Sequence, residues 1–218
     1  DTLICEGSST YVMIDFTGVP PWGIIYSDGT TEDTIQNVTS TPYQLNLSPT
    51  VTTTYTLSAA FDINQCESNE VTTFTITVYE LPLPLILSSD TIVCSDQLIV
   101  EAQEPNVGTG QWTSDADITF LPNENEPSVV VASSSFGTHT LTWTITNNIC
   151  IESTSLDVEY QEAPDPLSVY AGPDQLIFFQ FETQMDAQVP AVGGGTWQLS
   201  SGTGVVEDLT NPYSSISN

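Results

Sequence analysis

The chain has 218 residues with no lysine and no arginine, against 28 aspartates and glutamates and one histidine, for a formal charge of −28. Binding to nucleic acid and docking onto an anionic membrane surface both need cationic side chains, so this composition excludes both. No apolar run is long enough to cross a bilayer. Hydrophobic residues still make up 39% of the chain, enough to bury a core, and the abundance of threonine, serine and valine favours strands.

Residues 1–81 predict a first β domain. Short segments that alternate apolar and polar residues, separated by turn sequences such as Ser27-Asp28-Gly29, are typical of strands. The segment Glu-Leu-Pro-Leu-Pro at 80–84 then ends the unit, because prolines interrupt a sheet ladder and stiffen a linker. The expected strands are residues 11–16, 23–27, 43–47, 53–59 and 74–78.

Residues 82–164 predict a second β domain of the same kind. The clearest strand is the alternating segment 140–146, in which Leu141, Trp143 and Ile145 should face a core while the threonines face water. A second proline-containing linker, Glu-Ala-Pro-Asp-Pro at 162–166, follows. The expected strands are residues 97–102, 110–114, 128–132, 140–146 and 153–160.

An internal repeat relates the second domain to the residues after it. A shift of 85 residues places the pattern Ala-x-x-Pro-x-x-Gly-x-Gly-x-Trp of 102–112 on 187–197. We therefore expect an all-β chain of tandem immunoglobulin-like β-sandwich repeats on short proline-containing linkers. The same shift maps the last two strands of the second repeat beyond Asn218. Residues 165–218 should thus be the N-terminal part of a third repeat, open around Trp197, which either the continuing chain or a donor chain completes.

Four cysteines stand at Cys5, Cys66, Cys94 and Cys150, and none forms a Cys-x-x-Cys unit, so zinc and redox chemistry are not indicated. Each of the first two repeats has one early cysteine and one late cysteine in its last hairpin. This equal placement predicts a disulfide within each repeat, Cys5–Cys66 and Cys94–Cys150, and an oxidising, extracellular compartment. The shift places Phe179 where Cys94 stands, so the third repeat should lack such a bridge.

Several motifs resemble a known class of repeats. Ala-Gly-Pro-Asp-Gln at 171–175, Gly-Gly-Gly-Thr-Trp at 193–197 and Ser-Gly-Thr-Gly at 201–204 resemble tandem immunoglobulin-like or PKD-like repeats of very large Bacteroidota cell-surface proteins, such as gliding-motility adhesins. Cys-Glu-Gly at 5–7 with Gly-Val-Pro-Pro-Trp at 18–22 resembles a second variety. The resemblance implies export by type IX secretion to the cell surface. It also implies partners among other repeats of the same long chain, other surface proteins or surface polysaccharide.

His139 is the single histidine of the sequence, so a serine–histidine–aspartate arrangement could be built only around it. It shares strand parity with Leu141 and Trp143, which favours a structural role, and we predict no catalytic residue and no enzyme. The tryptophans Trp112, Trp143 and Trp197 fit core positions better than sugar-stacking platforms. Calcium is the one ligand that the carboxylates invite, although they fit a solvated acidic surface better. The candidate calcium ligands are Asp115, Asp117, Glu80, Asp90, Glu162, Asp165 and Asp174.

Three threonines, Thr2, Thr34 and Thr91, follow the aspartate-threonine pattern that the resemblance implies for O-glycosylation.

The sequence favours a structural or adhesive repeat segment of a secreted surface adhesin or filament, linked to gliding or attachment. An accessory carbohydrate- or calcium-dependent binding region of a secreted hydrolase is the main alternative. A surface protein of a halophile would explain the acidity and the missing lysine, but not the missing arginine.

Overall fold

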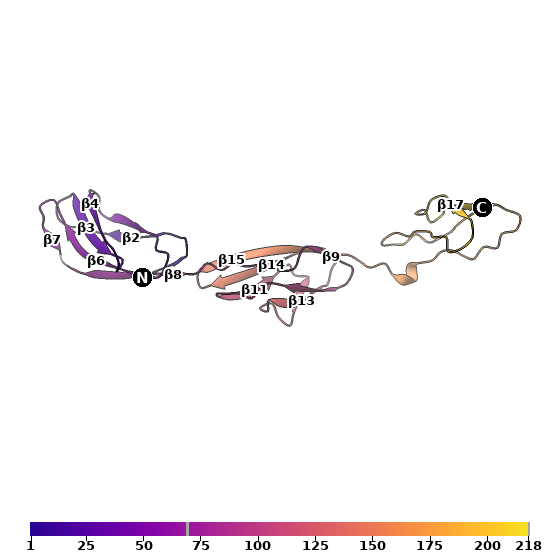
Figure 1. Ribbon diagram of the computed structural model, residues 1–218, viewed down its shortest axis with the longest axis horizontal. Coiled ribbons are helices and arrows are strands. Elements are labelled where there is room, and N and C mark those ends of the chain that lie inside the picture. The colour runs from indigo at the N-terminus through magenta and orange to yellow at the C-terminus, as the bar shows by residue number, and fades with distance from the viewer. Residues whose placement is uncertain (69, 218) are drawn as a thin grey trace.

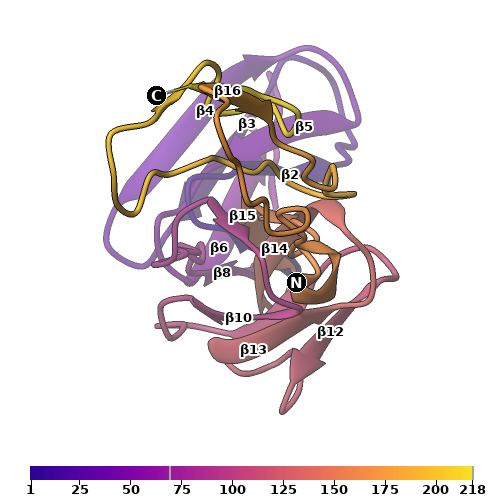
Figure 2. The same cartoon turned by 90° about the vertical axis from the view of Figure 1, so that its right-hand side faces the viewer.

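A computed structural model describes residues 1–68 and 70–217. Figure 1 shows three β units that follow one another along the long axis of the molecule, and Figure 2 shows the same units end-on, with the third repeat nearest the viewer. Within the described ranges the only helical turn is the 3-10 turn Pro166–Ser168, and no helix is long and apolar enough to cross a membrane. The expected all-β fold is confirmed.

The first repeat is a sandwich of two sheets. One sheet has the order β1-β8-β6-β3-β4, with β7 added to β6, and the other is the antiparallel pair β2-β5. Between them lie Ile24 and Ile76, both without exposed surface, together with Ile4 and Leu45. The strands are β1 (Thr2–Cys5), β2 (Thr10–Ile14), β3 (Trp22–Ser27), β4 (Glu32–Val38), β5 (Tyr43–Leu47), β6 (Thr53–Phe61), β7 (Glu67–Ser68) and β8 (Thr72–Tyr79).

The second repeat packs the sheet β10-β13-β12 against the sheet β11-β14-β15-β9. Its core contains the side chains that alternation placed there: Leu141, Trp143 and Ile145 are at most 1% exposed, and Trp112 leans on Trp143 with ring centroids 5.1 Å apart. The strands are β9 (Thr91–Val93), β10 (Gln97–Glu101), β11 (Thr109–Thr113), β12 (Ile118–Leu121), β13 (Ser128–Ser133), β14 (Gly137–Asn147) and β15 (Cys150–Tyr160).

The first strand of each complete repeat pairs in parallel with its last strand. Cys5 at the end of β1 lies opposite Tyr79 at the end of β8, and Val93 at the end of β9 lies opposite Tyr160 at the end of β15. Sequence alternation did not reveal β1 or β9, nor β4, β7 and β12. Most of these strands have four residues or fewer, too few for two periods of alternation, and β4 is an edge strand with mostly exposed side chains. The parallel pairing sets the position of the early cysteines.

The described part of the third repeat forms a single three-stranded sheet in the order β16-β18-β17, from β16 (Glu182–Gln184), β17 (Val205–Val206) and β18 (Ser215–Ser217). Its register follows the 85-residue shift, since Thr183 pairs with Ile216 as Leu98 pairs with Val131. Backbone hydrogen bonds follow it too: Ala187 N–H donates to Pro212 O at 3.1 Å, as Ala102 N–H donates to Pro127 O at 2.9 Å. The third repeat thus contains the counterpart of one of the two sheets of the second.

Candidate functional site

A disulfide joins the first repeat to the second. Cys5 and Cys150 are bonded with their Cα atoms 5.6 Å apart, whereas Cys66 and Cys94 are free and exposed. The predicted pairs Cys5–Cys66 and Cys94–Cys150 are therefore wrong. The bond crosses between repeats, and it closes a loop with a sequence separation of 145 residues.

Strand direction explains this correction. Cys5 lies beside Tyr79, where β8 ends and the linker leaves, whereas Cys66 lies in the hairpin that precedes β8. The eight residues of β8 alone span about 25 Å at 3.3 Å per residue. The early and late cysteines of one repeat thus lie at opposite poles, far beyond the Cα separation that a disulfide tolerates. The late cysteine of the next repeat, in contrast, faces the early cysteine of the one before.

The linker at this junction is held by side chains of the second repeat. Asn147, at the end of β14, donates its amide to the carbonyl oxygen of Glu80 at 2.8 Å, and Asn106 donates to the Glu80 carboxylate at 3.0 Å. Pro82 is fully buried. Gly108 has a φ of +74°, and a Cβ there would lie 2.2 Å from the Thr146 carbonyl oxygen, so this loop can lie against the hairpin only with glycine. The β14–β15 hairpin therefore locks the incoming chain both covalently and by hydrogen bonds.

The second junction has the same Glu-x-Pro-x-Pro pattern, but its linker proline is not buried. Glu162, Ala163 and Pro164 are all exposed. Asp165 accepts a hydrogen bond from Leu167 N–H at 2.8 Å and so caps the short 3-10 turn within the linker itself. In Figure 1 this linker runs alone between the second repeat and the third.

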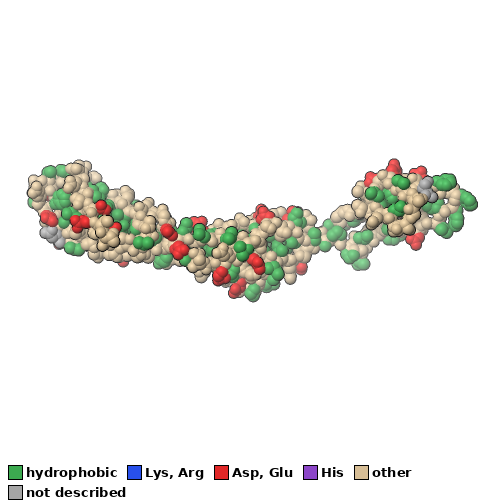
Figure 3. Space-filling view, in the orientation of Figure 1, with side chains coloured by type: hydrophobic (Ala, Val, Ile, Leu, Met, Phe, Trp, Pro, Cys, Tyr) green, Lys and Arg blue, Asp and Glu red, His purple; other side chains and the backbone are tan. Residues whose placement is uncertain are grey.

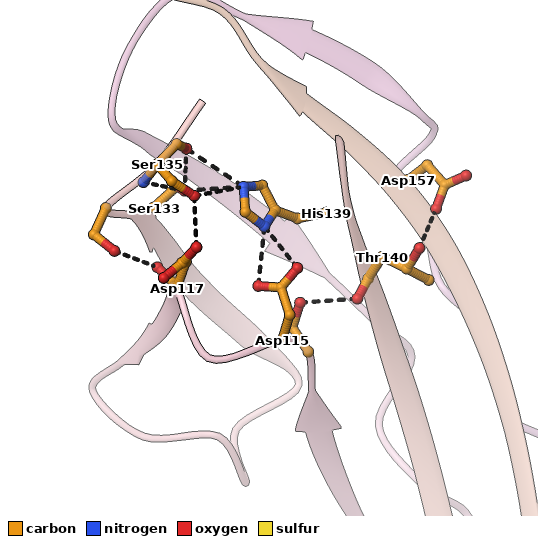
Figure 4. A network of polar contacts seen from close by, with 9 residues as sticks. Asp115, Asp117, Ser133, Ser135, His139, Thr140 and Asp157 are labelled. Carbon is orange, nitrogen blue, oxygen red and sulfur yellow. Dashed lines mark hydrogen bonds and ion pairs between the residues drawn. The ribbon is translucent and has the colours of Figure 1, made fainter. Parts of the chain in front are cut away.

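His139 is the centre of a polar cluster at the start of β14, the end of the second repeat nearer the third (Figure 4). The side chain is 6% exposed, and its Nδ1 lies 2.8 and 2.9 Å from the two carboxylate oxygens of Asp115. Its Nε2 faces the Ser135 carbonyl oxygen at 3.3 Å, the Ser133 hydroxyl at 3.3 Å and the Ser135 hydroxyl at 3.4 Å. The ring also stands edge-on against Tyr160. Burial raises the pKa of Tyr160, and nearby Asp96 raises it further.

The order aspartate–histidine–serine resembles a hydrolase triad, but its hydrogen bonds point elsewhere. The Ser133 hydroxyl donates to the Ser135 carbonyl oxygen at 2.6 Å, and the Ser135 hydroxyl donates to the Asp117 carboxylate at 2.8 Å. Neither serine therefore offers its proton to His139, as a nucleophile would. With so little of the imidazole exposed, no substrate can reach it. The cluster ties the loops around Asp115 and Ser135 to β14.

The structure does not gather the candidate calcium ligands. Asp115 and Asp117 contact His139 and Ser135, Glu80 accepts from Asn106, and Asp90 accepts from the backbone N–H of Asp157 at 2.9 Å. Asp165 caps its own turn, while Glu162 and Asp174 are exposed. Within residues 1–68 and 70–217, no group of three or more aspartate, glutamate, histidine or cysteine side chains could hold a metal ion. On the face shown in Figure 3, the carboxylates are scattered along all three repeats.

The remaining candidates divide between core and surface. Trp112 and Trp143 are buried, so they cannot stack on a sugar. Trp197 is half-buried and lines a cavity of about 370 Å³ with Tyr170, Pro190 and Pro212. Its indole N–H donates to the Asn211 carbonyl oxygen at 2.9 Å. The Trp112 indole N–H donates to the carbonyl oxygen of Pro127, whose counterpart Pro212 is the residue after Asn211. Trp197 is thus a core tryptophan by topology. Of the candidate glycosylation sites, Thr34 is exposed on β4, and Thr2 and Thr91 are half-buried on β1 and β9.

Sequence reasoning missed a set of aspartates that organise turns. Asp62 accepts N–H bonds from Asn64 at 2.8 Å and Cys66 at 3.0 Å, and these bonds, the one from Cys66 above all, lower its pKa. Asp28 does the same for Thr30 and Thr31, and its pKa is held far below the usual range. The available signal was Asp-x-Asn or Asp-x-Thr in a loop, the pattern of an Asx-turn.

No protein-family model matches this sequence, and no curated protein is detectably similar to it. Solved structures share its architecture at low identity. A marsupial T cell receptor aligns with 99% of this chain and 89% of its own, at 12% identity and a TM-score of 0.50. Two other structures align less well. An I-band fragment of titin aligns with 99% of this chain and 83% of its own, at 15% identity and a TM-score of 0.43. The fibronectin(III)-like modules of Clostridium thermocellum CbhA align with 74% of this chain and 90% of their own, at 13% identity and a TM-score of 0.39. The T cell receptor likeness and the sheets above establish tandem immunoglobulin-like β-sandwiches.

Proposed function

We propose that this chain is a spacer segment of a secreted cell-surface adhesin or filament, which holds adhesive parts away from the surface and transmits tension. The observation that carries the proposal is the Cys5–Cys150 bond, which fixes two successive sandwiches pole to pole. A bond within each repeat would stabilise that repeat alone. A bond between repeats instead restricts bending at the linker, which benefits an extended array.

The charge supports the same function. With 28 carboxylates and neither lysine nor arginine, successive repeats repel one another, and this repulsion favours an extended array over a folded-back one. The disulfide fits an oxidising compartment outside the cytoplasm. Export by type IX secretion, a Bacteroidota source and a part in gliding or attachment are supported by the sequence motifs at 171–175 and 193–204. Other repeats of the same chain, surface proteins and surface polysaccharide are the proposed partners.

Small-angle scattering tests the spacer function. The oxidised chain should have a longer maximum dimension than the reduced one, and this dimension should change less between low and high salt, because the first junction is fixed and only the second can bend. The double variant C5S/C150S should bend at residues 80–84 and become more compact in high salt, where carboxylate repulsion is screened. The matched control C66S/C94S removes the two free thiols and should behave as the parent does. A parent chain as compact and as salt-sensitive as C5S/C150S would overturn the proposal.

A further inference from the structure

Two cysteines, Cys66 and Cys94, remain free and exposed while the other two are bonded. In an oxidising compartment, unbonded and exposed thiols are unusual in a chain that already forms a disulfide. Each of the two occupies the position, in its own repeat, of one partner of the observed bond.

Cys66 is the counterpart of Cys150. Cys150 is the first residue after the tip of the β14–β15 hairpin and lies opposite Asn147. Cys66 follows the tip of the corresponding hairpin between β6 and β7, where Asp62 N–H donates to the Cys66 carbonyl oxygen at 3.2 Å. The buried carboxylate of Asp62 accepts the Cys66 N–H and the Val19 N–H, so the hairpin tip is held by side-chain bonds as well as by its ladder. Cys66 is therefore presented at the pole of the first repeat that faces away from the second.

Cys94 is the counterpart of Cys5. Cys5 ends β1 opposite Tyr79, three residues before the linker proline Pro82. Cys94 follows β9 by one residue, beside Gln161, whose N–H donates to the Val93 carbonyl oxygen at 2.8 Å, and Gln161 in turn stands three residues before Pro164. The early cysteine thus has the same position relative to the outgoing linker in both repeats.

We propose that Cys66 and Cys94 are the open ends of a repeating disulfide relay, in which the early cysteine of each module bonds to the hairpin cysteine of the module stacked after it. Cys94 takes a cysteine in the hairpin that closes the module after the second repeat, and Cys66 takes a cysteine at the end of the first strand of a module stacked before the first repeat. Phe179 replaces the early cysteine in the third repeat, so the relay stops there. The inference rests on the proposed function, because it requires modules stacked at both poles.

The chemistry is a two-electron oxidation by thiol–disulfide exchange with an oxidised dithiol, such as a disulfide oxidoreductase or oxidised glutathione. One cysteine thiolate attacks a sulfur of the oxidant disulfide, forms a mixed disulfide and expels a thiolate. The thiolate of the second cysteine then attacks the cysteine sulfur of the mixed disulfide and expels the other oxidant sulfur. Two S–H bonds are lost from the modules, one S–S bond forms, and the oxidant leaves as two thiols that carry both electrons and both protons.

The relay can be tested by inserting a second copy of residues 82–163 into the full chain, directly after Ala163. The inserted module is then stacked after the second repeat and brings its own hairpin cysteine. We expect a second bond, from Cys94 of the first copy to the Cys150 equivalent of the inserted copy. Of the six cysteines in this protein, two thiols should then react with an alkylating agent under denaturing, non-reducing conditions. Replacing Cys94 of the first copy by serine should raise this number to three, whereas C66S should lower it to one.

Four reactive thiols in the insertion protein would overturn the relay, as would peptide mapping that joins Cys94 to Cys66 of another copy. Scattering from the same samples separates this failure from a failure of the spacer function. A protein that is longer by one module yet has four free thiols would keep the spacer function and reject the relay. A protein that folds back on itself would reject the spacer function.

Discussion

The second and third repeats share the pattern Ala-x-x-Pro-x-x-Gly-x-Gly-x-Trp at an 85-residue spacing, yet only the second is closed. Trp112 is 1% exposed and Pro82 is buried, whereas Trp197 is half-buried and Pro164 is exposed. The difference lies in the β14–β15 hairpin. It covers the tryptophan with Trp143 and holds the incoming linker with Asn147 and Cys150. The described residues of the third repeat contain no counterpart of this hairpin. One supersecondary element thus both completes the core and fixes the junction.

The largest expected effect is loss of the covalent link. Replacing both bonded cysteines in C5S/C150S opens a loop with a sequence separation of 145 residues. Because the bond restricts the unfolded chain, its loss should lower the free energy of unfolding by up to about 5 kcal/mol. Denaturant unfolding should show the first two repeats destabilised in C5S/C150S and unaffected in the matched variant C66S/C94S. Equal stability of the two double variants would mean that the bond between repeats contributes nothing, and the contrast between the junctions would lose its covalent basis.

A matched pair of glycines tests whether the two cores differ. A Cβ at Gly110 would lie 2.0 Å from a ring carbon of Trp143, whereas a Cβ at its counterpart Gly195 meets nothing within 4 Å. We expect G110A to cost about 2–3 kcal/mol through overpacking. The substitution G195A should leave stability within about 0.5 kcal/mol. If thermal unfolding shows G195A to be as costly as G110A, the third repeat has a closed core in solution and the comparison fails.

The linkers should differ in their susceptibility to proteolysis. A glutamate-specific protease should cut after the exposed Glu162 at least tenfold faster than after Glu80, whose carbonyl and carboxylate are both hydrogen-bonded. N106A removes one of these bonds, worth about 1 kcal/mol, and should speed cleavage after Glu80 about fivefold. Ala191 is the counterpart of Asn106, so A191N should slow cleavage after Glu162.

Gels run without reductant provide the control for that experiment. Fragments cut after Glu80 should stay joined through Cys5–Cys150 and separate only on reduction, whereas fragments cut after Glu162 should separate in both gels. Cleavage at equal rates after Glu80 and Glu162 would show that the buried proline and the asparagine bonds do not restrain the first linker.

The smallest expected effect concerns one turn that the two repeats build with different residues. Asp208 accepts N–H and hydroxyl bonds from Thr210, which lower its pKa, and its counterpart Asn123 accepts from Asn125 without a charge. Because the folded pKa lies below the unfolded value of about 3.9, this stabilisation is present above that value and is lost as pH falls through the folded pKa. The Thr210 amide resonance of the parent chain should titrate with a midpoint below 3.9. Neither the Thr210 amide of D208N nor the Asn125 amide should titrate in that range. A midpoint at or above 3.9 would contradict the assignment.

The sequence predicted the parts of this molecule that local patterns encode. Alternation placed Leu141, Trp143 and Ile145 in a core, and the 85-residue shift relates β16 and β18 to β10 and β13. The disulfide could not be found in this way, because it depends on which pole each cysteine occupies. That pole follows from the parallel pairing of β1 with β8 and of β9 with β15, and three- or four-residue strands give no periodic signal.

The calcium candidates illustrate a similar gap. Asp115 and Asp117 are near in sequence, but their oxygen atoms are directed to His139 and Ser135, on β14 and in the loop before it. Their spacing in the sequence suggested that the two carboxylates could bind one calcium ion. In the folded repeat each carboxylate instead has its own hydrogen-bond partner.

Single-molecule extension tests whether a bond between repeats joins the first two sandwiches. With handles at the two ends, force in the oxidised chain passes from Cys5 directly to Cys150, so unfolding the residues between them cannot lengthen the tether. The 145-residue separation corresponds to roughly 500 Å of extended chain. The fully stretched parent should therefore be about 500 Å shorter before reduction than after it, whereas C5S/C150S should reach the longer length without reductant. Equal lengths of the parent with and without reductant would show that no bond joins Cys5 to Cys150.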